Sequence, residues 1–361
     1  MISITDVGKD PDDECTLSVL GNFTLQGLVH LLATVANLAP SKRRAQLTAS
    51  TMALLGMNGV PVGIGTSCGH KESEEIDRDD YQWKVPYLSL VDSKDLKLGK
   101  DLLVKKLVVA KDNSITLLLI SGMTDAAALF RNHRELFVEK IREVVIMGGI
   151  ERKDGAVVFD TDGDMIAESR AANNAFDFPA ASYLYKELQV MHVPMWVLCK
   201  EAAYAAPVSR AVYDELALTG HPVGIRLKEM QCASVSHLWK RVHMASDDPR
   251  REKLPAPCDA AWFLKTFCGG IDKGLTASDE IWPEVVSFNM YDPLTLLVAL
   301  PKYRHIYFDP HMVSVRGVEH GIVGLSAQAH GIKYPKAVAS FIHSQMVEAL
   351  DIYSQAMALA I

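Results

Sequence analysis

The sequence predicts an α/β protein: a single domain with a mainly parallel central sheet flanked by helices. Short apolar runs alternate with segments of helical spacing over most of the chain, which is typical of successive strand–helix–strand units. The 361 residues contain no long linker, internal repeat or low-complexity segment, so we expect residues 1–361 to form one domain. Polar residues follow several of the apolar runs, and open α/β sheets bind ligands at the carboxyl ends of their strands.

The expected strands and helices alternate along the chain. Apolar runs that indicate strands lie at residues 2–5, 28–35, 60–65, 114–120, 144–147 and 195–199. Helical spacing is found at residues 46–57, 126–137 and 179–188. The first of these helices is expected to end near Asn58-Gly59, because glycine is common just beyond a helix C-terminus. Residues 225–287 are less regular, and we expect either a helical cap over the site or helices packed on the edge of the core.

Composition argues against several kinds of partner. The net charge is −7, from 37 Lys and Arg against 44 Asp and Glu, so we expect neither nucleic acid nor an anionic membrane as partner. No apolar stretch approaches the roughly 20 residues of a membrane span, and the N-terminal residues lack signal-peptide features. The six cysteines lie far apart without a CxxC pair, which favours reduced thiols. We therefore expect a cytoplasmic protein whose partner is a small molecule.

An acidic segment directly follows the first expected strand. Its carboxylates are those of Asp6, Asp10, Asp12, Asp13 and Glu14. Carboxylates this close repel one another, so they need a cation or solvent. Their oxygens suit a hard cation such as calcium or magnesium. The alternative is a solvated acidic loop whose aspartates favour the N-terminus of the next helix, and this segment alone leaves both interpretations open.

Polar residues of the same character follow other strands or precede later helices. They are Asn37, Thr124, Asn173, Asn174 and Asp292. Asn37 ends the second apolar run, and Thr124 lies in the turn after the run at 114–120. Asn173 and Asn174 precede a helix, and Asp292 lies near the far end of the chain. A parallel sheet would bring the residues that follow its strands to one edge.

Two other charged segments favour structural interpretations. The segment that begins at Asp160 starts like an EF-hand loop, but its sixth position is Met165 and its twelfth is Ala171, so it predicts a solvated turn. A set of basic residues could meet a phosphate, although a solvated basic face is the favoured interpretation. These residues are Lys240, Arg241, Arg250 and Arg251.

Together, the polar segments resemble the calcium-dependent nucleoside hydrolases, the inosine-uridine nucleoside N-ribohydrolases. The matches follow the family's order over about residues 1–300: Asp6-Val7-Gly8 with Asp12-Asp13, Val35-Ala36-Asn37, Met123-Thr124-Asp125, residues 141–149, Asn173 with Asp177, and Tyr291-Asp292-Pro293-Leu294. The acidic opening and the tyrosine before the late aspartate look most like a divergent branch. That branch includes the nucleoside-hydrolase-like type III effectors of plant-pathogenic bacteria.

The resemblance implies a Rossmann-related α/β fold and calcium-dependent hydrolysis of the N-glycosidic bond of ribonucleosides or 5′-substituted ribosides. It implies that Ca²⁺ is held by Asp6, Asp13, the backbone carbonyl of Thr124 and Asp292. The other implied roles are general-base catalysis by Asp6, ribose binding by Asp12, Asn37 and Asn173 with help from Asn174, and a leaving-group contact by Tyr291. Relatives are often dimers or tetramers, so the resemblance also implies a homo-oligomer.

The chain departs from the family pattern at three places that bear on the substrate. Asp10-Pro11 is inserted in the opening motif, so either Asp10 or Asp12 could bind ribose, and the retained Asp-Asp pair favours Asp12. Tyr291 replaces a histidine, and a phenol with a pKa of about 10 is a poor acid near neutral pH. Ala171 replaces a glutamate near the ribose 5′ end, and its absence predicts tolerance of 5′-phosphates.

Two functions from different classes follow. The first is an enzyme, a calcium-dependent hydrolase of ribosides or nucleotides. The second is a catalytically weak protein that binds a ribosylated ligand such as ADP-ribose, and it is motivated by Tyr291. The retained acidic residues favour the enzyme, because a binding protein would not need all of them so close together.

Overall fold

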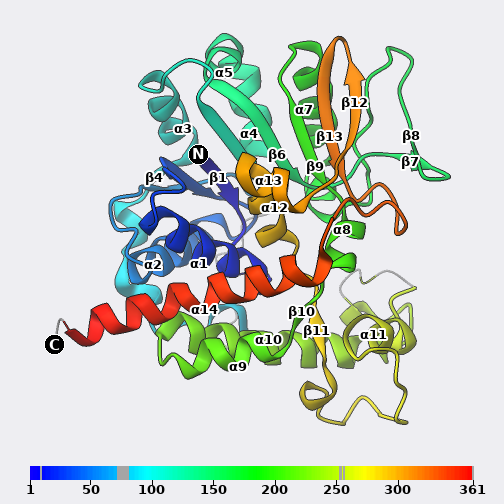
Figure 1. Ribbon diagram of the computed structural model, residues 1–361. Coiled ribbons are helices and arrows are strands. Elements are labelled where there is room, and N and C mark those ends of the chain that lie inside the picture. The colour runs from blue at the N-terminus through cyan, green and yellow to red at the C-terminus, as the bar shows by residue number, and fades with distance from the viewer. Residues whose placement is uncertain (9, 71–80, 252–253, 255–256, 360–361) are drawn as a thin grey trace.

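A nine-stranded sheet forms the centre of the computed structural model (Figure 1), which describes residues 1–361 except 9, 71–80, 252–253, 255–256 and 360–361. In the order of the chain, its strands are β1 (Ile2–Thr5), β2 (Ala33–Ala36), β3 (Val62–Ile64), β4 (Lys97–Leu98), β5 (Ile115–Leu119), β6 (Ile141–Met147), β9 (Met195–Leu198), β12 (His311–Val315) and β13 (Val318–Val323). Their order across the sheet is β12-β13-β9-β6-β5-β1-β2-β3-β4. All neighbours are parallel except the hairpin of β12 and β13, so the predicted mainly parallel sheet is confirmed.

The central strands are largely buried on both faces, which explains their mostly apolar sequence. In β5, Leu118 packs into one hydrophobic cluster, and Leu117 and Leu119 pack into the cluster on the other face. One face contacts α3 (Gly99–Val108), α4 (Thr124–Asn132), α5 (Arg134–Lys140) and α7 (Phe178–Val190). The other contacts α1 (Pro11–Leu25), α2 (Ser41–Leu54), α12 (Tyr291–Ala299) and α13 (Pro301–Tyr307).

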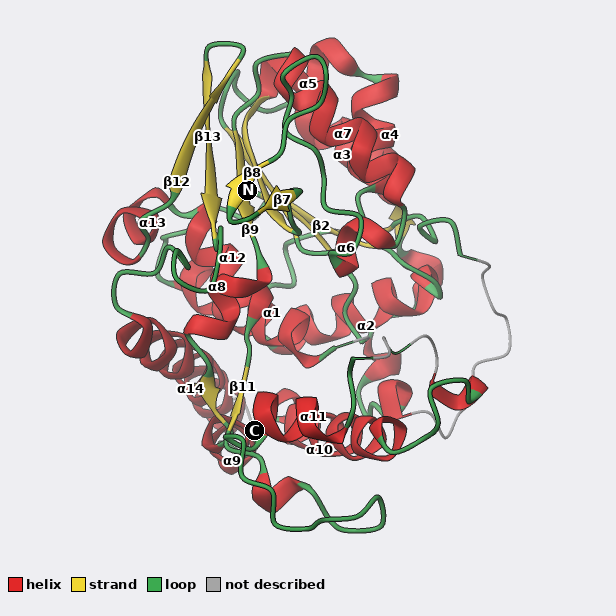
Figure 2. Ribbon diagram, turned by 90° about the vertical axis from the view of Figure 1, so that its right-hand side faces the viewer, coloured by secondary structure: helices red, strands yellow, loops and turns green. Residues whose placement is uncertain are grey.

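A second helical layer lies on the far side of α1 and α2 from the sheet (Figure 2). It contains α9 (Ala211–Leu218), α10 (Pro222–Val242), α11 (Ala260–Phe267) and α14 (Pro335–Leu359). Because α1 is enclosed between layers, most of its polar residues are buried. The hydroxyls of Thr16 and Ser18 donate to the carbonyls of Asp12 and Glu14 one turn earlier, which satisfies them without solvent.

Short elements connect these layers around the edge of the sheet. The short helices are α6 (Ala172–Ala175) and α8 (Lys200–Ala205). Two small antiparallel pairs are formed by β7 (Arg152–Lys153) with β8 (Ala156–Val157) and by β10 (Val208–Ser209) with β11 (Ser287–Phe288). The 3-10 turns lie at 81–83, 88–90, 93–95, 249–251 and 282–284. Among the described helices, none has the length and apolar character that a bilayer crossing requires.

Several predicted boundaries were wrong. The strand expected at 28–35 begins only at Ala33, and the helix expected from 46 begins at Ser41. The helix expected at 126–137 is two helices, because His133 between them leaves the helical conformation with φ −140° and ψ 48°. The β12–β13 hairpin at the sheet edge was not predicted. The irregular stretch 225–287 contains most of α10, then α11, with four undescribed residues between them.

Candidate functional site

A cavity of about 410 Å³ opens at the carboxyl edge of the sheet. Residues that follow three strands line it: Asp6 after β1, Ile120 after β5, and Gly148 after β6. The first turns of α1 and α12 add acidic residues, and α10 adds a wall that includes Gln231, Ser234, Val235 and Leu238. Part of the stretch predicted to be either a cap or an edge layer therefore lines the cavity.

The acidic residues meet because two helices begin at the same place. Asp12 and Asp13 lie in the first turn of α1, Asp292 lies in the first turn of α12, and the two helices pack together. Carboxylate oxygens of these three residues lie within 4.8 Å of one another. Asp6 follows β1 beside them and also lines the cavity. Acidic side chains suit the positive N-terminal ends of helices, which is why the sequence tolerates them there.

Hydrogen bonds anchor the residues that directly follow β1. Gly8 has φ +97°, a left-handed conformation that a side chain would strain. The Arg44 guanidinium donates to the carbonyls of Asp6 and Val7 at 3.0 and 3.1 Å. The Thr5 hydroxyl and the Asp6 amide, the latter at 3.0 Å, both donate to Oδ1 of Asp13. The carboxylate of Asp13 is therefore anchored through one oxygen.

Burial and mutual repulsion raise the pKa values of this cluster. Burial, then the charges of Asp6 and Asp12, raises the pKa of Asp13 well above its usual value. Burial, then Asp12, Asp13 and Asp6, does the same to the pKa of Asp292. Burial, then Asp10 and Asp6, raises the pKa of Asp12 to about 7. Within the described chain, no Lys or Arg forms an ion pair with Asp12, Asp13 or Asp292.

A divalent cation fits this arrangement. The donor set consists of carboxylate oxygens, which calcium and magnesium prefer. Buried carboxylates without a counter-charge are costly, and a cation would remove both the desolvation cost and the repulsion. The three close carboxylates are therefore a candidate site for a hard divalent cation.

Tyr291 begins α12 and faces the cavity beside Tyr204. The two rings lie 6.2 Å apart at 66°. Burial, then the neighbouring Tyr204, raises the pKa of Tyr291 well above its usual value. The phenol therefore keeps its proton at neutral pH and can donate a hydrogen bond, but it is a weaker acid than a free tyrosine.

The predicted sugar-binding residues divide into two groups. Asp10, Asp12 and Asn173 line the cavity, with Asp10 exposed and Asp12 half-buried in the acidic cluster. The amide of Asn173 donates to the Met147 carbonyl at 3.1 Å, which orients the side chain. Both candidates for the ribose-binding aspartate are therefore at the cavity, and only Asp12 belongs to the group of three close carboxylates.

Asn37 is not among the residues that line the cavity, so its expected sugar contact stays a prediction. Its amide nitrogen donates to the Gly122 carbonyl and to Asp125, both at 2.9 Å, and its oxygen accepts from the Ser121 hydroxyl. These bonds join the end of β2 to the turn after β5.

Asn174 and Thr124 also lie outside the cavity lining. The Asn174 amide donates to the carbonyls of Gly149 and Glu168, each at 3.0 Å, and its expected assistance to the sugar stays a prediction. The Thr124 hydroxyl donates to Asp177 at 2.7 Å. The predicted metal contact was through the Thr124 carbonyl, and that contact stays a prediction.

The basic residues at the cavity differ from those the sequence suggested. Arg170 and Lys200 line it, whereas none of Lys240, Arg241, Arg250 and Arg251 does. Arg251 is buried and donates to the carbonyls of Met244 and Cys258. The only sequence signal for Lys200 was its place just after an expected strand, and Arg170 had none.

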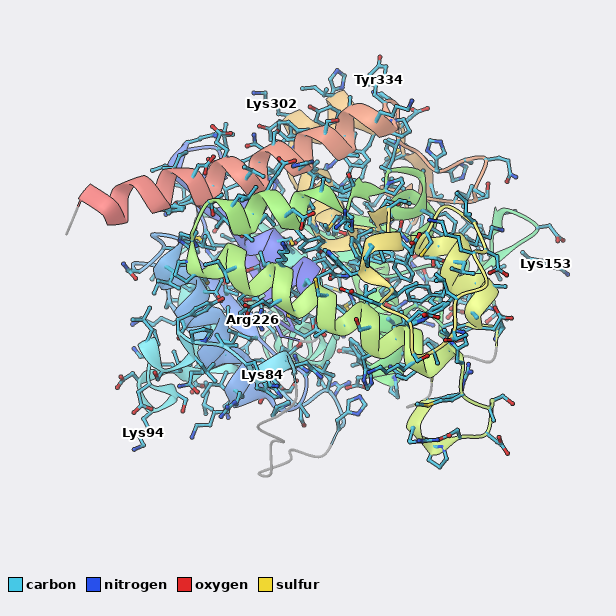
Figure 3. The ribbon with its side chains drawn as sticks, turned by 90° about the horizontal axis from the view of Figure 1, so that it is seen from below. Lys84, Lys94, Lys153, Arg226, Lys302 and Tyr334 are labelled. Carbon is cyan, nitrogen blue, oxygen red and sulfur yellow. The ribbon has the colours of Figure 1, made fainter. Side chains whose placement is uncertain are left out.

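A buried ion pair ties α10 to the acidic turn of α1. Glu14 follows Asp13 and pairs with Arg226 of α10, and their side chains are 0% and 2% exposed. The Thr51 hydroxyl donates to the other oxygen of Glu14 at 3.2 Å, and Arg226 also donates to the Gln82 carbonyl at 3.1 Å. Figure 3 shows Arg226 where α10 passes the N-terminal elements. This pair fixes one wall of the cavity relative to the acidic cluster.

Comparisons with known proteins agree with this geometry. No family model and no curated protein sequence matches the chain. Among solved structures, purine-preferring ribonucleoside hydrolase from Gardnerella vaginalis superposes with a TM-score of 0.61 at 15% identity, over 98% of this chain and all of that one. The inosine-uridine preferring nucleoside hydrolase from Bacillus anthracis gives 0.57 at 14%, over 97% of this chain and 98% of that one. The chain therefore has the nucleoside hydrolase fold.

The likeness to effector proteins is greater. The structure of type III effector protein XopQ complexed with adenosine diphosphate ribose gives a TM-score of 0.76 at 29% identity, over 97% of this chain and 92% of that one. The resemblance to the nucleoside-hydrolase-like effector branch, predicted from the sequence, is confirmed.

Proposed function

We propose that the cavity binds a ribosylated small molecule and that the chain hydrolyses its N-glycosidic bond with the help of a divalent cation, Ca²⁺. The observation that carries the proposal is the group of close carboxylates at the cavity, formed where α1 and α12 begin, with which no Lys or Arg among the described residues forms an ion pair. The hydrolase fold supports the reaction class, and the ADP-ribose complex of XopQ supports a ribosyl ligand.

In this proposal, Asp6, Asp13 and Asp292 hold the cation, together with the Thr124 carbonyl. A bound Ca²⁺ supplies Lewis-acid polarisation of the oxygens that it contacts. Asp12 accepts hydrogen bonds from the ribose hydroxyls, and Asn173 can both donate to these hydroxyls and accept from them. Asp6 takes a proton from the attacking water, whose oxygen bonds to the anomeric carbon while the base leaves with the electrons of the broken bond. The negative charge of the cluster stabilises the oxocarbenium-like transition state.

Leaving-group activation is the weak step. Tyr291 can donate a hydrogen bond to the departing base, but its raised pKa makes full proton transfer unfavourable. We therefore expect faster cleavage of substrates whose leaving group needs no proton. The same observation favours a second candidate function, retention of a ribosylated ligand such as ADP-ribose with little turnover.

Nitrophenyl riboside separates the two functions, because nitrophenolate leaves without protonation. We expect nitrophenolate release in Ca²⁺, loss of release in chelator, and loss in Asp13→Asn. Asp162→Asn, in an acidic group outside the cavity, is the matched control and should retain the rate. Absence of release, together with calcium-dependent binding of ADP-ribose by calorimetry, would establish the binding protein instead.

Two wider expectations remain predictions of the same kind. A homodimer or homotetramer is expected from the resemblance, and sedimentation of the purified chain would test it. A cytoplasmic location is expected from composition, and fractionation of the producing cell would test it.

A further inference from the structure

Side chains of opposite charge line different parts of the cavity. Most of the acidic residues come from the β1–α1 loop and the first turns of α1 and α12, and Glu168 lines the cavity near the basic residues. The basic residues are Arg170, which precedes α6, and Lys200, the first residue of α8. A ligand that contacts both parts must therefore present groups suited to each.

The acidic neighbours of the two basic residues pair with a third cationic residue. Arg152 of β7 donates to Glu168 at 2.8 Å and to Glu201 at 2.7 Å, and it also donates to the carbonyls of Gly324 and Leu325. The side chains of Arg152, Glu168 and Glu201 are 11%, 7% and 19% exposed. Arg152 thus holds in one buried network the two carboxylates that would otherwise compete for Arg170 and Lys200.

The two basic side chains themselves are left for solvent or a ligand. The side chain of Arg170 is 82% exposed, and its one ion pair is a loose 3.8 Å contact with Glu168. Lys200 is exposed and forms no ion pair with any residue that the structure describes. Three cationic groups therefore stand against two carboxylates at this part of the cavity, which leaves a net positive charge. The cations are Arg152, Arg170 and Lys200, and the carboxylates are those of Glu168 and Glu201.

Small residues connect this basic part to the sugar site. Ala171 and Ala172 follow Arg170 and line the cavity, and Asn173 comes next. A glutamate at position 171 would place a carboxylate between the basic pair and the sugar. The alanines leave that space open and without charge.

We propose that the ligand is a 5′-phosphorylated riboside and that Arg170 and Lys200 bind its phosphate. This rests on the proposed function, because Asn173 and Asp12 must bind the ribose for the phosphate to reach the pair. Guanidinium groups bind phosphate through two parallel hydrogen bonds, and a lysine ammonium adds a point charge. The site should therefore bind a 5′-phosphorylated riboside more tightly than the same riboside without its phosphate.

The test compares ligands that differ only in the phosphate. Dissociation constants in Ca²⁺ are measured by calorimetry for adenosine and AMP, and for ribose and ribose 5-phosphate, which have no base to lose. We expect the phosphate to tighten binding roughly 10- to 100-fold in the wild type at low salt. In the Arg170→Gln/Lys200→Gln variant, that ratio should fall to nearly one while the constant for adenosine stays unchanged. Lys240→Gln, an exposed residue outside the cavity lining, is the matched control and should keep the wild-type ratio.

Two results would overturn the phosphate site while leaving the proposed function intact: equal binding of adenosine and AMP by the wild type, or a ratio that survives in the double variant. Failure of all four ligands to bind would overturn the proposed function as well. ADP-ribose extends the series to a diphosphate. If ADP-ribose binds more tightly than adenosine and the double variant loses this advantage, the result supports phosphate binding by Arg170 and Lys200. If the advantage survives in the double variant, the result contradicts it.

Discussion

Two acidic groups in this protein have similar composition and opposite electrostatics. Asp160, Asp162 and Asp164 bring carboxylate oxygens as close together as Asp12, Asp13 and Asp292 do. In the first group the carboxylates have partners: Lys186 lies 2.6 Å from Asp162, and Arg316 donates to both oxygens of Asp164 at 2.7 and 2.9 Å. In the second group, no described Lys or Arg is an ion-pair partner.

The directions of the pKa shifts express this difference. Backbone amides, chiefly that of Asp164, and Lys186 lower the pKa of Asp160. Burial and neighbouring carboxylates raise the pKa values of Asp13 and Asp292. The comparison teaches that a high density of acidic residues does not by itself indicate a metal site. The indication comes from buried acidic residues that have no cationic partner within the part of the chain that the structure describes.

The largest expected effect concerns Glu14, a buried carboxylate next to the site that is paired with Arg226. Arg226→Met leaves Glu14 buried without its cation, and we expect a loss of about 3–5 kcal/mol in the free energy of unfolding, measured in urea. Arg134→Met, which removes the partly exposed pair with Glu187, should cost less than about 1 kcal/mol. If the Glu14→Gln/Arg226→Met variant were no more stable than Arg226→Met, the unpaired charge would not be the cause.

The second effect concerns the response of the Tm to Ca²⁺, which tests whether the cluster of Asp12, Asp13 and Asp292 binds the cation. Ca²⁺ should raise the Tm of the wild type by several degrees, because a ligand at 100 times its Kd adds about 2.7 kcal/mol. Asp13→Asn should abolish this rise and increase the Tm in chelator, because it removes one of the repelling charges and keeps an oxygen for Thr5 and Asp6. Asp162→Asn should leave the calcium response unchanged. A calcium response that persists in Asp13→Asn would contradict the assignment of the cluster.

The third effect concerns His320, a buried basic group whose charged form is destabilised by burial, as the charged forms of Asp13 and Asp292 are. His320 accepts a hydrogen bond from the Met195 amide through Nδ1, and burial lowers the pKa of His320 to about 4. Because the unfolded chain binds this proton more tightly, stability should be lost as the pH falls from about 6.5 to about 4, by about 1–3 kcal/mol. His320→Asn keeps an acceptor and should flatten the urea-unfolding profile in that window. An unchanged slope would assign the acid sensitivity to other groups.

The smallest expected effect comes from making the second acidic group resemble the first. Lys186→Gln/Arg316→Gln removes the cationic partners of the second acidic group. In an Asp13→Asn background, we expect a weak calcium-dependent rise of Tm, equivalent to about 1 kcal/mol or less, where the parent variant shows none. No response would mean that burial and the convergence of two helix N-termini, more than charge balance, decide where the cation binds.

Much of the site could be predicted because its residues lie where local pattern places them. The strands at 2–5 and 114–120 are short and mostly apolar, Asp6 comes directly after the first of them, and Asp12 lies in the first turn of the helix that follows. Asn37 also follows a strand, but its hydrogen-bond partners could not be predicted. Its hydrogen bonds reach Ser121, Gly122 and Asp125, which come from another strand end, and only the packing of β2 near β5 decides that its amide faces them.

The α/β alternation, the strand ends and the acidic opening could be predicted from local sequence, because they depend on neighbours a few residues apart. Which charges are compensated depends on the packing of distant segments. Asp292 joins Asp12 and Asp13 because α12 packs on α1, while Glu168 and Glu201 meet at Arg152 and leave Arg170 and Lys200 facing the cavity. Electrostatic energy depends on distance in space and on burial, and neither is encoded in the spacing of residues along the chain.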